Sequence, residues 1–317
     1  SSDVCSSDLK RKTCKACPNP PPRRIAGLQP DIETLSHSLI DALPDGALPG
    51  GAIDLITGFA QPLPVIIISR LLGVPEGMAD QLLRWSNAMV GMYQARRTHA
   101  MERAASEAAR DFADFLRGYI DQRRKAPADD LITQLIAAES DGERLSTDEL
   151  IATCILLLNA GHEATVHTIG NGVKTLLETG AMAQILSPDT VAATVEEILR
   201  FDPALHMFTR FAYETVEVMG HTFQRGDRIG LLLGATNRDP QVWDRADQFL
   251  PQRPDKPNLT FGAGLHFCVG APLARLELQI ALPILFRRLP GLRLAAPPPR
   301  YADVYHFHGL EQLLLLR

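Results

Sequence analysis

Apolar residues recur at helical spacing over most of the first 200 residues. In DIETLSHSLIDAL, the side chains that share one helix face are Ile32, Leu35, Leu39 and Leu43. The same period appears in MADQLLRWSNAMVGM and in THAMERAASEAARDFADFLRGYIDQRRK, whose basic end suits a helix C-terminus. These patterns predict amphipathic helices that pack around a common core.

One helix is expected to be much longer than the others. Ser146 in STDEL is a suitable N-cap, and Glu149 completes a capping box. From there the apolar pattern continues without a breaker to about Glu178, and ILLLNAG is hydrophobic on most sides. We therefore expect this helix to run through the middle of the core.

After residue 200 the pattern changes to short strands. VEVMGHTFQRGDRIGLLLGATN predicts a strand, a turn at residues 225–227 and a second strand. A Pro-rich loop over 239–258 precedes APLARLELQIALPILFRRL, a helix with Pro272 in its first turn and Pro283 as an expected kink. The tail alternates turns and short strands. With no linker visible, the sequence predicts one mainly α domain with small β-sheets.

Composition narrows the class of protein. The chain has 317 residues, of which 45% are hydrophobic and 22% charged, as in ordinary globular proteins. A net charge of -5 argues against nucleic acid as a partner. The sequence has no run of about 18 apolar residues, so it predicts no membrane span. The five unevenly spaced cysteines do not suggest a disulfide framework, so a reducing, cytoplasmic location is expected.

The first 21 residues look different from the rest. SSDVCSSDL repeats SSD, and the basic, Pro-rich run after it has neither periodicity nor the apolar segment of a signal peptide. We expect residues 1–21 to be a disordered or non-native lead and residues 22–317 to form the domain. Cys14 and Cys17 have no second ligand pair at usable spacing, so a zinc site is not expected there.

The stretch FGAGLHFCVG, residues 261–270, carries the clearest chemistry. Cys268 lies just before a helix, where the dipole and free N–H groups favour a thiolate. Its glycines allow close approach of a flat group, and His266 suits an anionic one. A core cysteine would explain Cys268 but not the glycines, and a dinucleotide loop fails because the glycines have the wrong spacing. The stretch therefore indicates a thiolate metal ligand.

The pattern F-x-x-G-x-x-x-C-x-G followed by APLARLE closely resembles the haem-binding loop of the cytochrome P-450 family. The resemblance implies that family's mainly α fold and a haem b whose iron takes the Cys268 thiolate as its axial ligand. The other residues that it places at the haem on this side are Phe261, Gly262, His266, Gly270 and Ala274.

Two further segments match the same family. Glu197 and Arg200 in VEEILRFDP are three apart and share a helix face, a common spacing for a surface ion pair. With Arg253 in QFLPQRP, the resemblance implies a structural charge cluster that supports the haem loop. It also implies that Arg210 in FTRFA pairs with one haem propionate, and that His266 pairs with the other.

The segment AGHEAT lies in the middle of the long helix. Its Ala160 and Gly161 leave room for a ligand, and Glu163 is costly in an apolar helix unless it is paired or functional. H-E-x-x-x-H spacing is unlike the zinc motif H-E-x-x-H, so zinc is not expected.

The resemblance implies that this segment crosses the distal haem face, where an acid followed by an alcohol delivers protons to bound oxygen. Glu163 supplies the acid, but Ala164 follows it in place of the alcohol. Thr165 is one residue further and rotated by about 100°. Glu163 and Thr165 are the candidate catalytic residues, and water or a substrate hydroxyl is expected to complete the relay.

The implied activity is mono-oxygenation of a small hydrophobic organic substrate by a soluble, bacterial-type member. Electrons would come from a ferredoxin and its reductase, because the chain has no flavin or iron–sulfur motif. A face with Arg275, Arg287 and Arg288 would dock that partner, or these would simply be solvated charges. We expect a monomer whose substrate pocket includes Ala164, Leu205 and Phe307.

The resemblance starts at about residue 22, and we find no counterpart of the family's N-terminal portion, so a truncated member is expected. Two alternatives to an enzyme stay open: an inactive remnant, and a haem-thiolate carrier or sensor. Haem retention separates the remnant from the others, and substrate-dependent consumption of reductant separates the enzyme from the carrier.

Overall fold

A computed structural model describes residues 22–44, 48–94, 96–140, 143–180, 185–254, 256–304 and 306–317. The predicted lead, residues 1–21, lies outside the described residues, as do Cys5, Cys14 and Cys17. The described helices are α2 (Pro22–Gly27), α3 (Gln29–Asp41), α4 (Pro62–Leu72), α5 (Ala79–Val90), α6 (His99–Lys125), α7 (Leu131–Ala137), α8 (Thr147–Thr179), α10 (Val191–Phe201), α11 (Leu233–Thr236) and α12 (Ala271–Arg288).

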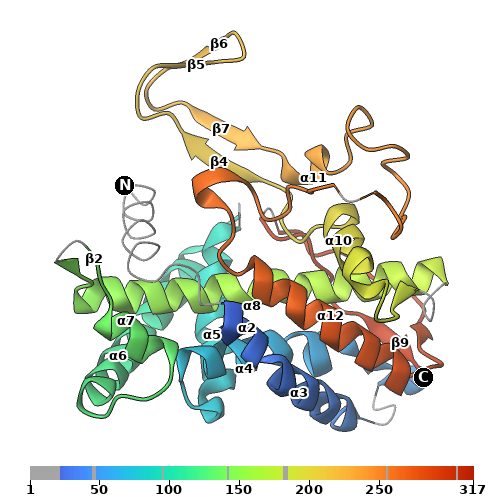
Figure 1. The fold of residues 1–317 in the computed structure, drawn as a ribbon, viewed down its shortest axis with the longest axis horizontal. Coiled ribbons are helices and arrows are strands. Elements are labelled where there is room, and N and C mark those ends of the chain that lie inside the picture. Colours follow the sequence, from blue (N-terminus) through green and yellow to red (C-terminus); the bar gives the residue numbers. More distant parts are fainter. Residues whose placement is uncertain are drawn as a thin grey trace.

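Helix α8 crosses the whole molecule and organises the fold (Figure 1). It spans 33 residues, and both halves of the predicted Ser146–Glu149 capping box are formed. Gly180 ends it in the left-handed conformation that glycine adopts most easily. Helices α4, α5, α6, α7, α10 and α12 all contact it. The predicted central helix is therefore confirmed.

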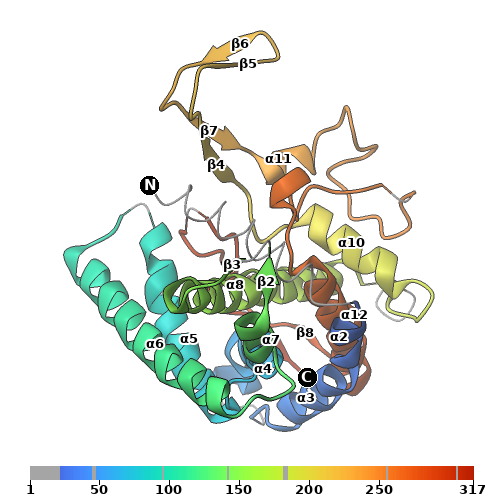
Figure 2. The same cartoon turned by 60° about the vertical axis from the view of Figure 1, so that its left-hand side comes forward.

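The other helices form two groups around α8. Helices α5 and α6 pack on each other on one side, and α3 packs on α12 on the other (Figure 2). The predicted apolar face of α3 is confirmed. Ile32 and Leu35 are buried, as is Leu43 just beyond the helix, and Leu39 packs against the core. Helix α12 begins with Pro272 at its N-terminus and runs through Pro283.

The strands in the described part of the chain are short and form four small antiparallel sheets. They are β1 (Ile53–Asp54), β2 (Glu139–Ser140), β3 (Glu143–Arg144), β4 (Phe208–Phe211), β5 (Val216–Val218), β6 (His221–Phe223), β7 (Arg228–Leu231), β8 (Arg293–Leu294) and β9 (Leu314–Leu316). Their pairings are β1–β9–β8, β2–β3, β4–β7 and β5–β6.

The region after residue 211 corrects one prediction. In place of a single strand–turn–strand unit, the chain makes a first turn at Met219 and Gly220, both with positive φ, to form the β5–β6 hairpin. The predicted turn at residues 225–227 then leads into β7, which pairs with β4. Sequence reasoning missed the first turn because methionine rarely adopts a positive φ. The β4–β7 pair and the hairpin project from the helical body (Figure 1).

The predicted mainly α fold with small sheets is confirmed. No helix in the described part of the chain is long and apolar enough to cross a membrane.

Candidate active site

Cys268 lies in a tightly bent loop between a coil and α12. Gly262 and Gly264 have φ values of +69° and +64°, which side chains rarely tolerate, and a short 3-10 turn follows at Gly264–His266. The backbone N–H of Cys268 donates to the carbonyl of Phe261 at 3.0 Å, which closes the loop. A side chain at Gly270 would start 3.8 Å from the Cys268 sulfur. The loop thus presents a half-buried thiol at the mouth of α12.

The loop lies between the β4–β7 pair and α8 (Figure 1). Arg275 packs on the Phe261 ring, with its guanidinium carbon 4.6 Å from the ring centroid, and also pairs with Glu196. Ala274 continues α12 by donating its N–H to Gly270. His266 is exposed in the 3-10 turn.

Arg210 comes from β4 and is half-buried. Its guanidinium donates to the Thr209 carbonyl at 3.0 Å and lies 5.8 Å from the Phe208 ring centroid. The predicted docking arginines are partly used within the protein, because Arg275 pairs with Glu196 and Arg288 pairs with Asp41.

Glu197, Arg200 and Arg253, which the family resemblance places in one charge cluster, lie together in the structure. Arg200, on α10, is 1% exposed and forms a two-pronged ion pair with Glu197 at 2.7 and 2.8 Å. Its remaining N–H groups donate to the carbonyls of Asn237, Ala246 and Gln248. Arg253 reaches the same carboxylate at 3.1 Å. The cluster therefore joins α10 to the loop that leads toward Cys268.

The AGHEAT segment has one open face and one packed face. Ala160 is exposed, Ala164 is half-buried, and Leu156, one turn before Ala160, is 48% exposed. Gly161 faces elsewhere, because a Cβ there would lie 3.3 Å from the side chain of Ile68 on α4. Its missing side chain thus serves the packing of α8 on α4, a role that the sequence did not reveal.

Glu163 lies between two imidazoles on α8. Its carboxylate oxygens are 3.3 Å from His162 Nε2 and 3.3 Å from His167 Nε2. Burial raises the pKa of Glu163, but hydrogen bonds from both histidines outweigh this effect and lower the pKa to about 2. The costly acid is thus a carboxylate paired with a histidine on each side.

A cavity of about 180 Å³ opens beside this carboxylate. Helices α5 and α8 and the segment before β9 form its walls, with Glu163, His167 and the predicted pocket residue Phe307 among the lining residues. Leu205 does not line the cavity but forms an isolated β-bridge with Phe307. Thr165 is buried, and its hydroxyl donates to the Gly161 carbonyl at 3.3 Å.

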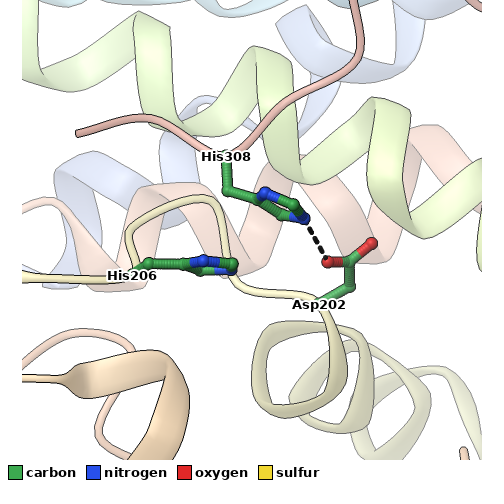
Figure 3. Close-up of side chains that lie close together, drawn as sticks. All are labelled: Asp202, His206 and His308. Atoms are coloured by element: carbon green, nitrogen blue, oxygen red, sulfur yellow. Dashed lines mark ion pairs between the residues drawn. The ribbon is translucent and has the colours of Figure 1, made fainter. Parts of the chain in front are cut away.

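A second cluster has no counterpart in the sequence predictions. Asp202, His206 and His308 bring three potential metal-ligand atoms within 4.8 Å of one another (Figure 3). Asp202 and His206 are four residues apart, but His308 comes from the far end of the chain. The HFH stretch at 306–308 is the only hint of a metal-binding cluster in the sequence, and it does not indicate that Asp202 and His206 lie beside His308.

The donor set around Cys268 fits a haem. A single soft thiolate at a helix N-terminus can ligate a haem iron, whereas a structural zinc site needs four ligands. Large apolar side chains remain exposed on the elements beside the loop: Leu156 on α8, Phe208 and Phe211 on β4, and Phe267 in the loop itself. Exposed apolar side chains on these elements suit a broad apolar ring system, and the cationic Arg210 on β4 suits carboxylate groups.

Comparison with known proteins agrees with this geometry. A family model described as "Cytochrome P450" matches residues 189–292. Polyketide biosynthesis cytochrome P450 PksS of Bacillus subtilis is 37% identical over 297 residues, covering 92% of this chain and 71% of the relative. The 6-deoxyerythronolide B hydroxylase of Saccharopolyspora erythraea is 37% identical, covering 86% of this chain and 66% of the relative.

Solved structures show the same likeness. The PksS structure superposes with a TM-score of 0.86 at 34% identity, covering 97% of this chain and 78% of that one. P450BioI, solved with a hexadec-9Z-enoic acid-ligated acyl carrier protein, gives a TM-score of 0.87 at 34% identity, covering 96% of this chain and 78% of that one. The chain therefore belongs to the cytochrome P450 family of haem mono-oxygenases.

Proposed function

We propose that this chain binds haem b through Cys268 and uses it to insert one oxygen atom from O2 into a small hydrophobic organic substrate, with electrons from a ferredoxin and its reductase. The observation that carries this proposal is the Cys268 loop. Its glycines bend it sharply, it is closed by the Cys268–Phe261 hydrogen bond, and it presents one thiol at the N-terminus of α12.

Several residues would hold the haem. Cys268 would ligate the iron, and Arg210 and His266 would pair with the propionates. Ala160, Phe261, Gly262, Gly270 and Ala274 are proposed to lie around the ring. When bound, a thiolate-ligated haem supplies the chemistry that activates O2. The protein binds the substrate, excludes water and supplies protons.

Glu163 is the proposed proton-relay residue on the α8 side, where its carboxylate would orient the water that carries the proton. Its carboxylate is ionised over the physiological range, and it lines the cavity with His167. Ala164 offers no hydroxyl, and the Thr165 hydroxyl already donates to the Gly161 carbonyl. We therefore assign the last step of proton delivery to a water or a substrate hydroxyl, with Thr165 in a supporting position on α8.

The proposed substrate pocket combines Ala164, Leu205 and Phe307. Ala164 is a half-buried residue of α8, and Leu205 and Phe307 are joined by the β-bridge beside the cavity. The side chains of these three residues are apolar, which suits a hydrophobic substrate. Relatives named for polyketide biosynthesis and for 6-deoxyerythronolide B hydroxylation make secondary-metabolite chemistry a reasonable source of test substrates.

The test is substrate-dependent turnover. The haem-loaded chain is combined with a bacterial ferredoxin and its reductase, and a panel of macrolactones and fatty acids is screened for product carrying one added oxygen. We expect reductant consumption that rises with substrate and is lost in Cys268→Ser. Haem binding without substrate-dependent consumption would favour the carrier or sensor, and failure to bind haem would favour the remnant.

A further inference from the structure

We infer that Asp202, His206 and His308 form a binding site for a divalent transition metal ion, separate from the thiolate site. The three side chains supply one carboxylate oxygen and two imidazole nitrogens within 4.8 Å of one another (Figure 3). This donor set suits zinc and its neighbours in the first transition series, and a fourth position would be left for water.

Two of the ligand atoms already have the spacing that a metal ion requires. Asp202 Oδ1 and His308 Nε2 are 3.2 Å apart. Two ligands on a tetrahedral zinc ion, each about 2.1 Å from the metal, lie roughly 3.4 Å apart. The ion would replace the proton that now lies between these atoms, and His308 would carry its proton on Nδ1.

The third ligand needs a small movement. The His206 and His308 rings are stacked with their centroids 4.0 Å apart, so a turn of the His206 side chain is required to aim its nitrogen at the ion. His206 is exposed and can make this turn, and its exposure gives the ion a route of entry. Gly234 makes room for the His206 ring, because a Cβ at position 234 would lie 3.1 Å from that ring.

The surroundings hold the other two ligands in place. Tyr301 donates its hydroxyl to Asp202 Oδ2, which leaves Oδ1 for the ion. The buried side-chain amide of Asn171, on α8, donates to the backbone carbonyls of both Asp202 and His308, at 3.2 and 2.9 Å. Supporting hydrogen bonds of this kind are typical of metal sites and raise their affinity.

Occupation of this site would tie two segments together. His206 and His308 directly follow Leu205 and Phe307, the residues of the β-bridge, and Phe307 also lines the cavity. A bound ion would therefore stabilise the bridge beside the proposed pocket. The site is thus placed to couple metal binding to the shape of the cavity wall.

The test is Zn2+ binding by isothermal titration calorimetry. The parent protein for this experiment is the full chain with the substitutions Cys14→Ser and Cys17→Ser, so that this thiol pair cannot compete for Zn2+. We expect one equivalent of Zn2+ to bind, with affinity reduced at least ~100-fold in His206→Ala and in His308→Ala, and about 10-fold in Tyr301→Phe. Zn2+ should also raise the melting temperature of the parent chain but not of His206→Ala.

His221→Ala is the matched control, because His221 is an exposed histidine on β6 outside the cluster. It should bind Zn2+ like the parent chain. If His308→Ala fails to fold, the exposed His206 still decides the question. No Zn2+ binding by the parent chain, or equal binding by the parent and His206→Ala, would overturn the inference.

Discussion

At the scale of single residues, Glu163 shows how a charge is kept on a largely apolar helix. Two histidines on the same helix bring its pKa down to about 2 despite burial, so the carboxylate stays ionised in any physiological buffer. Because the pKa is lowered, the stability that the ionised form contributes is present above about pH 4.5 and is lost as the pH falls toward 2. Activity between pH 5 and 9 should therefore not report its titration.

Replacing Glu163 with Gln keeps the shape and removes the charge. If the Glu163 carboxylate relays protons through bound water, product formed per unit of reductant should fall about 100-fold, a typical contribution of one proton-transfer group. Glu178→Gln is the control, since Glu178 is on the same helix but pairs with Lys174 near its end. The measurement is product per unit of reductant in the ferredoxin system. Equal coupling in the two variants would remove Glu163 from the relay.

Glu277 on α12 is the opposite case. It is 1% exposed, and neither carboxylate oxygen has a hydrogen-bond partner in the described part of the chain. Burial raises its pKa to about 8. The folded protein thus keeps a proton that the unfolded chain releases near pH 4.5, and stability should fall by about 1.4 kcal/mol per pH unit between pH 5 and 8.

The expected result for Glu277→Gln is a flatter dependence of stability on pH. The free energy of unfolding, measured in urea at pH 5, 6.5 and 8, should decline less in the variant, and the variant should be the more stable protein at pH 8. Glu178→Gln again serves as the exposed control. A slope unchanged by Glu277→Gln would show that this carboxyl does not titrate in the folded protein as its burial predicts.

At the scale of elements, the Arg200 cluster joins α10 to the loop that precedes Cys268. Its planar guanidinium makes two bonds to Glu197 and three to carbonyls, a fork that lysine cannot reproduce. Among the residues that the structure describes, Arg200→Ala would also leave Glu197 with Arg253 alone as a charged partner.

We expect Arg200→Lys to destabilise the fold clearly, and Arg200→Ala to cost about 3–5 kcal/mol of unfolding free energy. Urea unfolding monitored by circular dichroism measures both changes. Arg225→Ala is the matched control, because Arg225 is exposed in the turn between β6 and β7. If Arg200→Ala behaved like the control, the cluster would have no role in stability.

The elements also show what local sequence can predict. Helices α3, α8 and α12 follow from periodicity, the capping box and Pro272, because each signal lies within a few residues of the structure that it specifies. The β5–β6 turn was missed although Gly220 lies in it, because its other residue with a positive φ is Met219, a residue type that rarely adopts that conformation. The packing reason for Gly161 was also hidden, since it depends on Ile68 in another helix.

At the scale of the whole molecule, long-range convergence decides what remained unpredictable. Cys268 could be identified because its loop and helix carry the signal in ten residues. The Asp202–His206–His308 cluster could not be identified, because its members come from distant parts of the chain. Even Tyr301, which donates a hydrogen bond to Asp202, is 99 residues away from it in sequence. No pattern in one segment states which distant segment it will meet.

The proposed function requires that this chain builds a haem-thiolate site on Cys268. The most direct measurement is the difference spectrum of the haem-reconstituted chain after reduction and addition of carbon monoxide. We predict a strongly red-shifted Soret band that is present in the parent chain, lost in Cys268→Ala and retained in Glu163→Gln. A chain that takes up no haem, or a band typical of histidine ligation that persists in Cys268→Ala, would contradict the claim.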